Sequence, residues 1–334
     1  MRPVPFDGAH TPRHILSMPR SFVLTLVMAL AACSGDPGRR VPLGEGRLPV
    51  PGGSIWYKVS GTGRGTPVVL LHGGPGFSSY YLKPFEELGD DRIVIRYDQL
   101  GGGKSDTTSD TTLFTIERFV SELDALRSHL GVGKWHVFGH SWGTILALEY
   151  YRAHPDRVAS LTFGSPVFDI PAYEHRANEL VATLSDSSQR AVRRALATGR
   201  YDTPAFQGAI NEFYGLYLFR HPVPADLDSS LASFNQAIYV YMQGPSEFTI
   251  TGTLKPYDVT GFLPRIQVPT LVTVGEFDEV GPDLVRRHAG QIPGARFELF
   301  AGAAHMTPWD AREANLRAVR EFLRAADSVS VGPR

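Results

Sequence analysis

A serine set between two glycines, in Gly139-His140-Ser141-Trp142-Gly143, constrains the fold of this chain more than any other feature. Residues 134–138 before it have the apolar character of a buried strand, and residues 144–151 after it have that of a helix. A sharp turn from strand to helix needs glycine on both sides, because side chains there would clash with neighbouring backbone. The turn exposes the serine hydroxyl beside a helix N-terminus, which favours developing negative charge. The motif therefore predicts that Ser141 is a nucleophile, and an ordinary glycine-rich turn is the alternative.

Strand-like and helix-like segments alternate on both sides of this motif. Apolar residues at helical spacing predict helices at 116–130 and at about 311–325. The strand-like runs lie at 54–60, 67–71, 92–97, 134–138, 158–163, 270–274 and 297–300. Such alternation is typical of a mostly parallel sheet with helices on both faces, so we expect an α/β fold.

The alternation stops between residues 169 and 262. This stretch shows helical periodicity near 173–184, 187–198 and 204–220, and it is rich in aromatic residues. A structureless loop of about 90 residues is implausible inside a compact domain. We therefore expect residues 169–262 to form a helical cap, inserted between two halves of one core at 46–168 and 263–328.

Two loops downstream carry the residues that a catalytic serine requires. A serine hydroxyl needs a general base, and the base needs a carboxylate to orient it. The strand at 270–274 leads into Asp278, and the strand at 297–300 leads into His305. Both loops should lie at the same sheet edge as Ser141. We predict that His305 is the base and Asp278 the orienting acid, with Glu276 and Glu279 as alternatives for the acid.

Acyl transfer also needs hydrogen-bond donors for the oxyanion. The backbone N–H of Trp142, directly after the nucleophile, is one predicted donor. The other should come from the loop after the strand at 67–71, which reads His72-Gly73-Gly74-Pro75-Gly76. We predict Gly74 as this donor, with Gly73 as the alternative.

Other features exclude several classes of function. The net charge is -1, and lysines and arginines are scattered, which gives no indication of a nucleic-acid partner. Gly103-Lys104-Ser105 resembles the end of a phosphate-binding loop, but Asp98 stands where that motif requires glycine. His136 and His140 are four residues apart in a strand and turn rather than on one helix face, so we expect no metal.

The N-terminal region predicts export. An apolar run at 21–32 follows Arg20, and it is shorter than the roughly 20 residues of a membrane span. Small residues then precede Cys33, the only cysteine, in a pattern that resembles the bacterial lipobox. We expect residues 1–33 to be a lipoprotein signal peptide with a lipidated Cys33. A plain secretory signal or an uncleaved anchor is the alternative, and Met18 is an alternative start.

Residues 34–45, rich in glycine, proline and arginine, predict a flexible tether. Ser34 after the cysteine resembles the outer-membrane sorting pattern. We therefore expect a bacterial lipoprotein that is anchored at the periplasmic face of the outer membrane.

Taken together, the motifs resemble the prolyl aminopeptidase (proline iminopeptidase) family of α/β-hydrolases, including its tricorn-interacting aminopeptidase branch. The matching segments lie at 72–76, 97–105, 139–143 and 242–253, and the likeness spans roughly residues 50–325. His140 replaces the small residue that is usual before the family's serine.

The resemblance implies an α/β-hydrolase fold with a helical cap, no cofactor, and an acyl-enzyme route. It implies release of an N-terminal residue, often proline or another small or apolar residue, from short peptides or amino-acid amides. The family holds the free amine with cap carboxylates, since a buried ammonium needs a paired carboxylate. Glu247 matches that position in motif, and Glu212 is a second, looser candidate.

Two other functions are compatible with the sequence. A carboxylesterase or another small-molecule hydrolase could carry the same Ser141, Asp278 and His305. An esterase has no need of an ammonium partner, so Glu247 discriminates between the two readings. A non-catalytic, peptide-binding surface lipoprotein is a more remote alternative.

Overall fold

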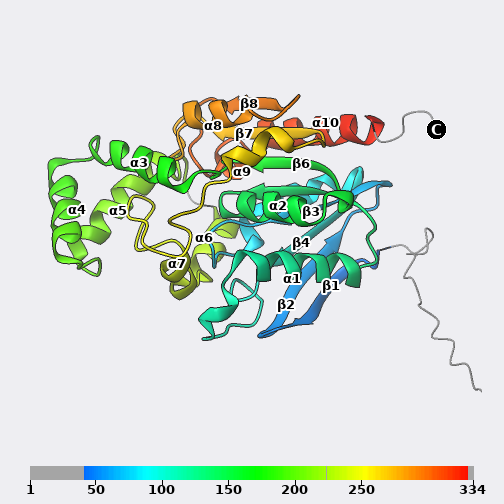
Figure 1. Cartoon of the computed structure of the whole chain (residues 1–334), viewed down its shortest axis with the longest axis horizontal. Helices are drawn as coiled ribbons and strands as arrows, with labels where there is room; N and C mark the ends of the chain where they lie inside the picture. The colour runs from blue at the N-terminus through cyan, green and yellow to red at the C-terminus, as the bar shows by residue number, and fades with distance from the viewer. Residues whose placement is uncertain (1–40, 223, 330–334) are drawn as a thin grey trace, which may run out of the picture. The chain divides into compact units, whose positions relative to one another are not determined.

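The core of the protein is a mixed, mostly parallel sheet (Figure 1). A computed structural model describes residues 41–222 and 224–329. Within them, eight strands lie in the order β1-β2-β4-β3-β5-β6-β7-β8. The pairs β1/β2 and β2/β4 are antiparallel, and every other neighbouring pair is parallel. The strands are β1 (Gly44–Val50), β2 (Gly53–Ser60), β3 (Gly65–Leu71), β4 (Arg92–Asp98), β5 (Trp135–His140), β6 (Val158–Gly164), β7 (Thr270–Gly275) and β8 (Arg296–Phe300).

Helices cover both faces of this sheet, as the sequence predicts. One face packs against η1 (Ser79–Asp90) and α10 (Arg312–Val329). The other packs against α1 (Ile116–His129), α2 (Trp142–Ala153) and α8 (Pro282–Ala289). The short helices are η2 (Thr111–Leu113), η3 (Pro155–Arg157), η4 (Thr260–Arg265) and α9 (Thr307–Asp310).

The continuous apolar run in β3 explains why both faces are covered. Val69 and Leu71 belong to the hydrophobic cluster under α1 and α2, whereas Val68 and Leu70 belong to the cluster under η1 and α10. All four are fully buried. Side chains alternate between the faces of a strand, so a strand without polar alternation must be buried on both sides.

In the part of the chain that the structure describes, five α-helices interrupt the α/β order between β6 and β7. They are α3 (Ile170–Val181), α4 (Asp186–Thr198), α5 (Pro204–Tyr217), α6 (Ala225–Ala232) and α7 (Gln236–Met242). Local sequence fixes several of their starts: the side chains of Asp169, Ser185 and Thr203 each accept a hydrogen bond from a backbone N–H in the first turn. We call residues 170–254 the cap. Figure 1 shows α3, α4 and α5 together in green on the left.

The N-terminal edge differs from the prediction. β1 begins at Gly44, so the end of the predicted 34–45 tether is part of the sheet. Gly44 pairs with Val59, and the register continues to the β1–β2 turn. The sequence of β1 lacks the apolar pattern that predicts a strand, because an edge strand needs little apolar surface. The predicted signal peptide, Cys33 and residues 34–40 lie outside the described residues. Among the helices of the described segments, none is long and apolar enough to cross a membrane.

Candidate active site

The turn from β5 into α2 holds Ser141 in a strained backbone conformation. Its φ of 54° and ψ of -126° are outside the regions that side chains usually adopt. A Cβ on Gly139 would lie 2.1 Å from the carbonyl oxygen of Gly143, and a Cβ on Gly143 would lie 2.3 Å from that of Leu71. Only glycine fits at either position, which gives the sharp strand-to-helix turn that the sequence predicts.

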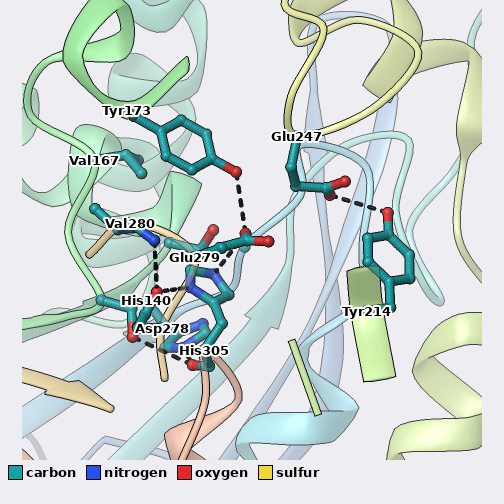
Figure 2. A network of polar contacts seen from close by, with 12 residues as sticks. His140, Val167, Tyr173, Tyr214, Glu247, Asp278, Glu279, Val280 and His305 are labelled. Atoms are coloured by element: carbon teal, nitrogen blue, oxygen red, sulfur yellow. Dashed lines mark hydrogen bonds and ion pairs between the residues drawn. The ribbon is translucent and has the colours of Figure 1, made fainter. Parts of the chain in front are cut away.

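The loops after β7 and β8 bring Asp278 and His305 together (Figure 2). Nδ1 of His305 lies 2.8 Å from Oδ1 of Asp278, and both side chains are buried. The N–H of Val280 donates to the same oxygen at 3.0 Å. Glu276 is exposed and accepts a hydrogen bond from the N–H of Gly302, so it lies away from the imidazole. Asp278 is therefore the carboxylate placed to orient His305.

The charge around His305 is strongly negative. Burial lowers the pKa of this imidazole, but Asp278, Glu279 and Glu247 outweigh it and raise the pKa to about 9. Conversely, burial raises the pKa of Asp278, and the His305 charge and hydrogen bond bring it below its usual value. The site therefore stabilises an imidazolium, which is the species that a general base becomes.

The two predicted oxyanion donors lie beside the serine. Gly74, Ser141 and Trp142 line one cavity. Trp142 is the first residue of α2, where backbone N–H groups have no partner inside the helix. The N–H of Gly73 donates to the Tyr81 hydroxyl at 2.7 Å, whereas the hydrogen bonds of the described residues do not use the N–H of Gly74. This leaves Gly74, rather than Gly73, available for an oxyanion.

Two carboxylates from the cap and from the loop after β7, Glu247 and Glu279, line the same cavity. Oε1 of Glu247 accepts hydrogen bonds from Tyr239 at 2.6 Å and from Tyr214 at 3.0 Å. Oε1 of Glu279 accepts one from Tyr173 at 3.0 Å and lies 3.9 Å from Nε2 of His305. Burial raises the pKa of both carboxyl groups.

The other oxygen of each carboxylate, Oε2, is buried and has no hydrogen-bond partner among the described residues. Buried polar atoms are nearly always satisfied, so these two oxygens, on residues that line one cavity, are acceptors for a donor bound there, preferably a cation. From the sequence, Glu279 is expected only as an alternative acid for His305. Its position directly after Asp278 was the available signal for its place in the site.

The structure corrects the prediction for Glu212. Its carboxylate accepts hydrogen bonds from the N–H of Ser185 at 2.7 Å and from the hydroxyls of Ser185 and Ser188 at 2.7 and 2.5 Å. These bonds, led by that from Ser188, lower the pKa of Glu212. Glu212 therefore caps the start of α4, and Glu279 takes the place beside Glu247.

A buried hydrogen-bond chain runs behind the serine. Nε2 of His140 lies 2.9 Å from the carbonyl oxygen of His305, and Nδ1 lies 3.0 Å from the Tyr81 hydroxyl. Burial, followed by the charge of His305, lowers the pKa of His140 to about 3. Neutral His140 can thus donate to His305 and accept from Tyr81, which accepts from Gly73. In the sequence, His140 stands out only as a departure from the family motif.

The cavity at Ser141 has two lobes that share Gly74, Ser141, Tyr239, Glu247 and Glu279. The small lobe has a volume of about 340 Å³, including solvent at its mouth. The large lobe has a volume of about 640 Å³, counted in the same way. The small lobe is completed mainly by Trp142, Ile145, Val167, Ile170, Tyr173 and Leu254. His305 lines the large lobe, whose further wall is aromatic and aliphatic.

Comparison with known proteins shows the family to which the chain belongs. Residues 66–311 match the model of the alpha/beta hydrolase fold. A proline iminopeptidase of Heyndrickxia coagulans is 39% identical over 284 residues, which cover 84% of this chain and 99% of the relative. The crystal structure of a Mycobacterium smegmatis proline iminopeptidase superposes with a TM-score of 0.78 at 31% identity, covering 86% of this chain and 99% of that one. The crystal structure of VinJ gives a TM-score of 0.81 at 30% identity, over 85% of this chain and 99% of VinJ. The chain therefore belongs to the proline iminopeptidase family of α/β-hydrolases.

Proposed function

We propose that this protein is a serine aminopeptidase that releases the N-terminal residue, proline or another small apolar residue, from short peptides or amino-acid amides. The observation that carries the proposal is the pair of buried carboxylates, Glu247 and Glu279, beside Ser141. Each keeps one oxygen without a partner among the described residues. A substrate ammonium supplies hydrogen-bond donors to these oxygens and the compensating charge. The relatives named proline iminopeptidase support proline as the first residue.

The mechanism follows from the positions of the side chains. His305 takes the proton of the Ser141 hydroxyl at Nε2 while the serine oxygen attacks the first carbonyl carbon. Asp278 holds the imidazole through Nδ1 and stabilises the imidazolium. The N–H groups of Gly74 and Trp142 receive the oxyanion. His305 then gives its proton to the leaving amine, the C–N bond breaks, and an acyl-enzyme remains. Water, activated by the same imidazole, releases the amino acid.

The small lobe suits a first residue of limited size. Ile145, Val167 and Ile170 give it an apolar wall next to the carboxylate pair. A prolinium nitrogen carries two N–H groups, and the two carboxylates offer two unpartnered oxygens. A primary ammonium carries a third N–H, which needs a further acceptor. This match favours proline over alanine in the same lobe.

The test compares prolyl-, alanyl- and phenylalanyl-p-nitroanilide with their N-acetyl forms and with p-nitrophenyl acetate, using Ser141→Ala as the blank. We expect serine-dependent cleavage of the free-amine anilides, with proline the best, and its loss on N-acetylation. Ester cleavage that is indifferent to the amine, without cleavage of any anilide, would make the protein a carboxylesterase instead.

We also propose that the protein is exported and anchored through a lipid on Cys33, at the periplasmic face of the outer membrane. The apolar run at 21–32 and the small residues before this cysteine support the proposal. Cys33→Ser should move the full-length protein from the membrane fraction to the soluble periplasmic fraction. An unchanged membrane fraction would contradict the lipid anchor.

A further inference from the structure

The two lobes of the cavity differ in the catalytic group that each contains. His305 lines only the large lobe, whereas Trp142, with its oxyanion N–H, lines only the small lobe. The general acid must contact the leaving nitrogen during acyl transfer. On the proposed function, on which this inference rests, the first residue occupies the small lobe. The residue after the scissile bond then extends into the large lobe.

The far wall of the large lobe is apolar and comes from separate parts of the chain. Phe77 follows the oxyanion loop, Leu218 and Phe219 follow α5, and Leu231 and Phe234 lie at and beyond the end of α6. The rings of Phe77 and Phe234 pack edge to face with centroids 5.7 Å apart. Tertiary packing thus supplies a continuous apolar surface that no single sequence motif indicates.

Charge is confined to one end of this lobe. Of the described residues that line it, the carboxylates Glu247 and Glu279 and the imidazole of His305 gather at the end next to Ser141. No lysine, arginine or aspartate is among these lining residues. A charged side chain in the far part would lose water without gaining a partner, whereas an apolar side chain would bury its surface.

The size and opening of the lobe also fit a large group. Its volume of about 640 Å³ exceeds the roughly 340 Å³ of the small lobe. Leu231 is 38% exposed, so the lobe meets solvent at this residue. An aromatic or branched side chain can therefore enter while the rest of a peptide or amide continues outward.

We propose that the large lobe is the subsite for the residue after the scissile bond, and that it selects an apolar or aromatic side chain there. The preferred substrates are then peptides or amides with a small first residue and a bulky apolar second residue.

The test measures kcat/KM for release of proline from Pro-Phe-NH2, Pro-Leu-NH2, Pro-Gly-NH2 and Pro-Asp-NH2. We expect the phenylalanine and leucine substrates to exceed the glycine substrate about tenfold to a hundredfold, and the aspartate substrate to fall below it. Proline release at equal rates from all four would overturn the subsite while leaving the aminopeptidase intact. Failure to cleave these amides and prolyl-p-nitroanilide would overturn both.

A charge placed in the lobe gives a second readout. Leu231→Asp should lower the Pro-Phe-NH2 to Pro-Gly-NH2 ratio about tenfold and raise the rate with Pro-Lys-NH2 relative to Pro-Phe-NH2. Leu196→Asp is the matched control, since Leu196 is 49% exposed on α4 and outside the lobe. The control should leave every ratio unchanged. Identical ratios in Leu231→Asp and wild type, with both proteins folded, would overturn the proposal.

Discussion

At the scale of single residues, the carboxylate of Glu279 links substrate binding to proton transfer. It lies 3.9 Å from Nε2 of His305, the nitrogen that must receive the Ser141 proton. Together with Asp278 and Glu247, it raises the pKa of His305 to about 9 against the effect of burial. A substrate ammonium bound by Glu279 would cancel part of this negative charge. The binding of a free amine thus also favours the neutral form of the base.

This arrangement predicts the pH dependence of Glu279→Gln. His305 must be neutral to accept a proton, so activity is lost as the pH falls through its pKa. Removal of the Glu279 charge lowers that pKa, and the acid limb of kcat/KM should move to lower pH. The measurement uses p-nitrophenyl acetate, which has no amine, between about pH 6 and about pH 10, a range that includes the His305 pKa of about 9. An acid limb at the wild-type position would contradict the role of Glu279.

At the scale of secondary-structure elements, the loop before η1, the end of β5 and the loop after β8 meet through His140 and Tyr81. Their hydrogen bonds join Gly73, next to the predicted oxyanion donor, to the backbone of His305. These hydrogen bonds fix the position of the oxyanion loop relative to His305. Small displacements of catalytic groups reduce rates strongly, so this chain should matter for turnover.

Tyr81→Phe removes one link of that chain without changing the ring. We expect kcat for prolyl-p-nitroanilide to fall roughly tenfold to a hundredfold, while KM changes little. Tyr97→Phe is the control, because the buried hydroxyl of Tyr97 has no hydrogen-bond partner among the described residues. Equal kinetics in the two variants would show that the chain does not position the catalytic groups.

The elbow between β5 and α2 makes a separate prediction about stability. Gly143→Ala places a Cβ 2.3 Å from the carbonyl oxygen of Leu71, so backbone must move. We expect a loss of about 1–3 kcal/mol in the free energy of unfolding, measured by urea titration. Gly133→Ala, whose Cβ would meet nothing within 4 Å, should change it by less than about 0.5 kcal/mol. A Gly143→Ala protein as stable as the control would contradict the close approach.

At the scale of the whole molecule, sequence predicts the chemistry at the strand ends better than the contacts between distant segments. Parallel strands end at one sheet edge, so the loops carrying Ser141, Asp278 and His305 meet there by topology alone. The pairing of Glu279 with Glu247 and the hydrogen bond between His140 and Tyr81 depend on how the cap and η1 pack, which no local pattern encodes. Glu212 reaches from α5 to the start of α4, a tertiary contact that its motif position does not reveal.

The opposite edge of the sheet holds the C-terminal helix through a buried polar cluster. Asp327 of α10 accepts hydrogen bonds from Arg92 at 3.0 Å and from His136 at 3.1 Å. Burial alone would raise the pKa of Asp327, but the hydrogen bonds from His136 and Thr66 and the charge of Arg92 lower it to about 2. The folded-state pKa is thus below the unfolded value, so this contribution is present above about pH 4 and is lost as the pH falls toward 2.

Asp327→Asn should therefore destabilise the protein by about 3 kcal/mol at pH 7, because it leaves the charge of buried Arg92 uncompensated. Urea unfolding measures the change. Asp156→Asn, which breaks an exposed pair with Arg157, should cost less than about 1 kcal/mol. The difference between the two variants should shrink as the pH approaches 2. A difference that stays constant between pH 7 and pH 2 would contradict the assignment.

Amine recognition is tested most directly by the effect of Glu247→Gln on two substrates at one pH above the acid limb. Glutamine keeps an oxygen for Tyr214 and Tyr239 but removes the charge that pairs with an ammonium. We predict that kcat/KM for prolyl-p-nitroanilide, relative to that for p-nitrophenyl acetate, falls by roughly a hundredfold. An unchanged ratio would contradict amine recognition at the carboxylate pair and would leave Glu247 a buried, structural residue.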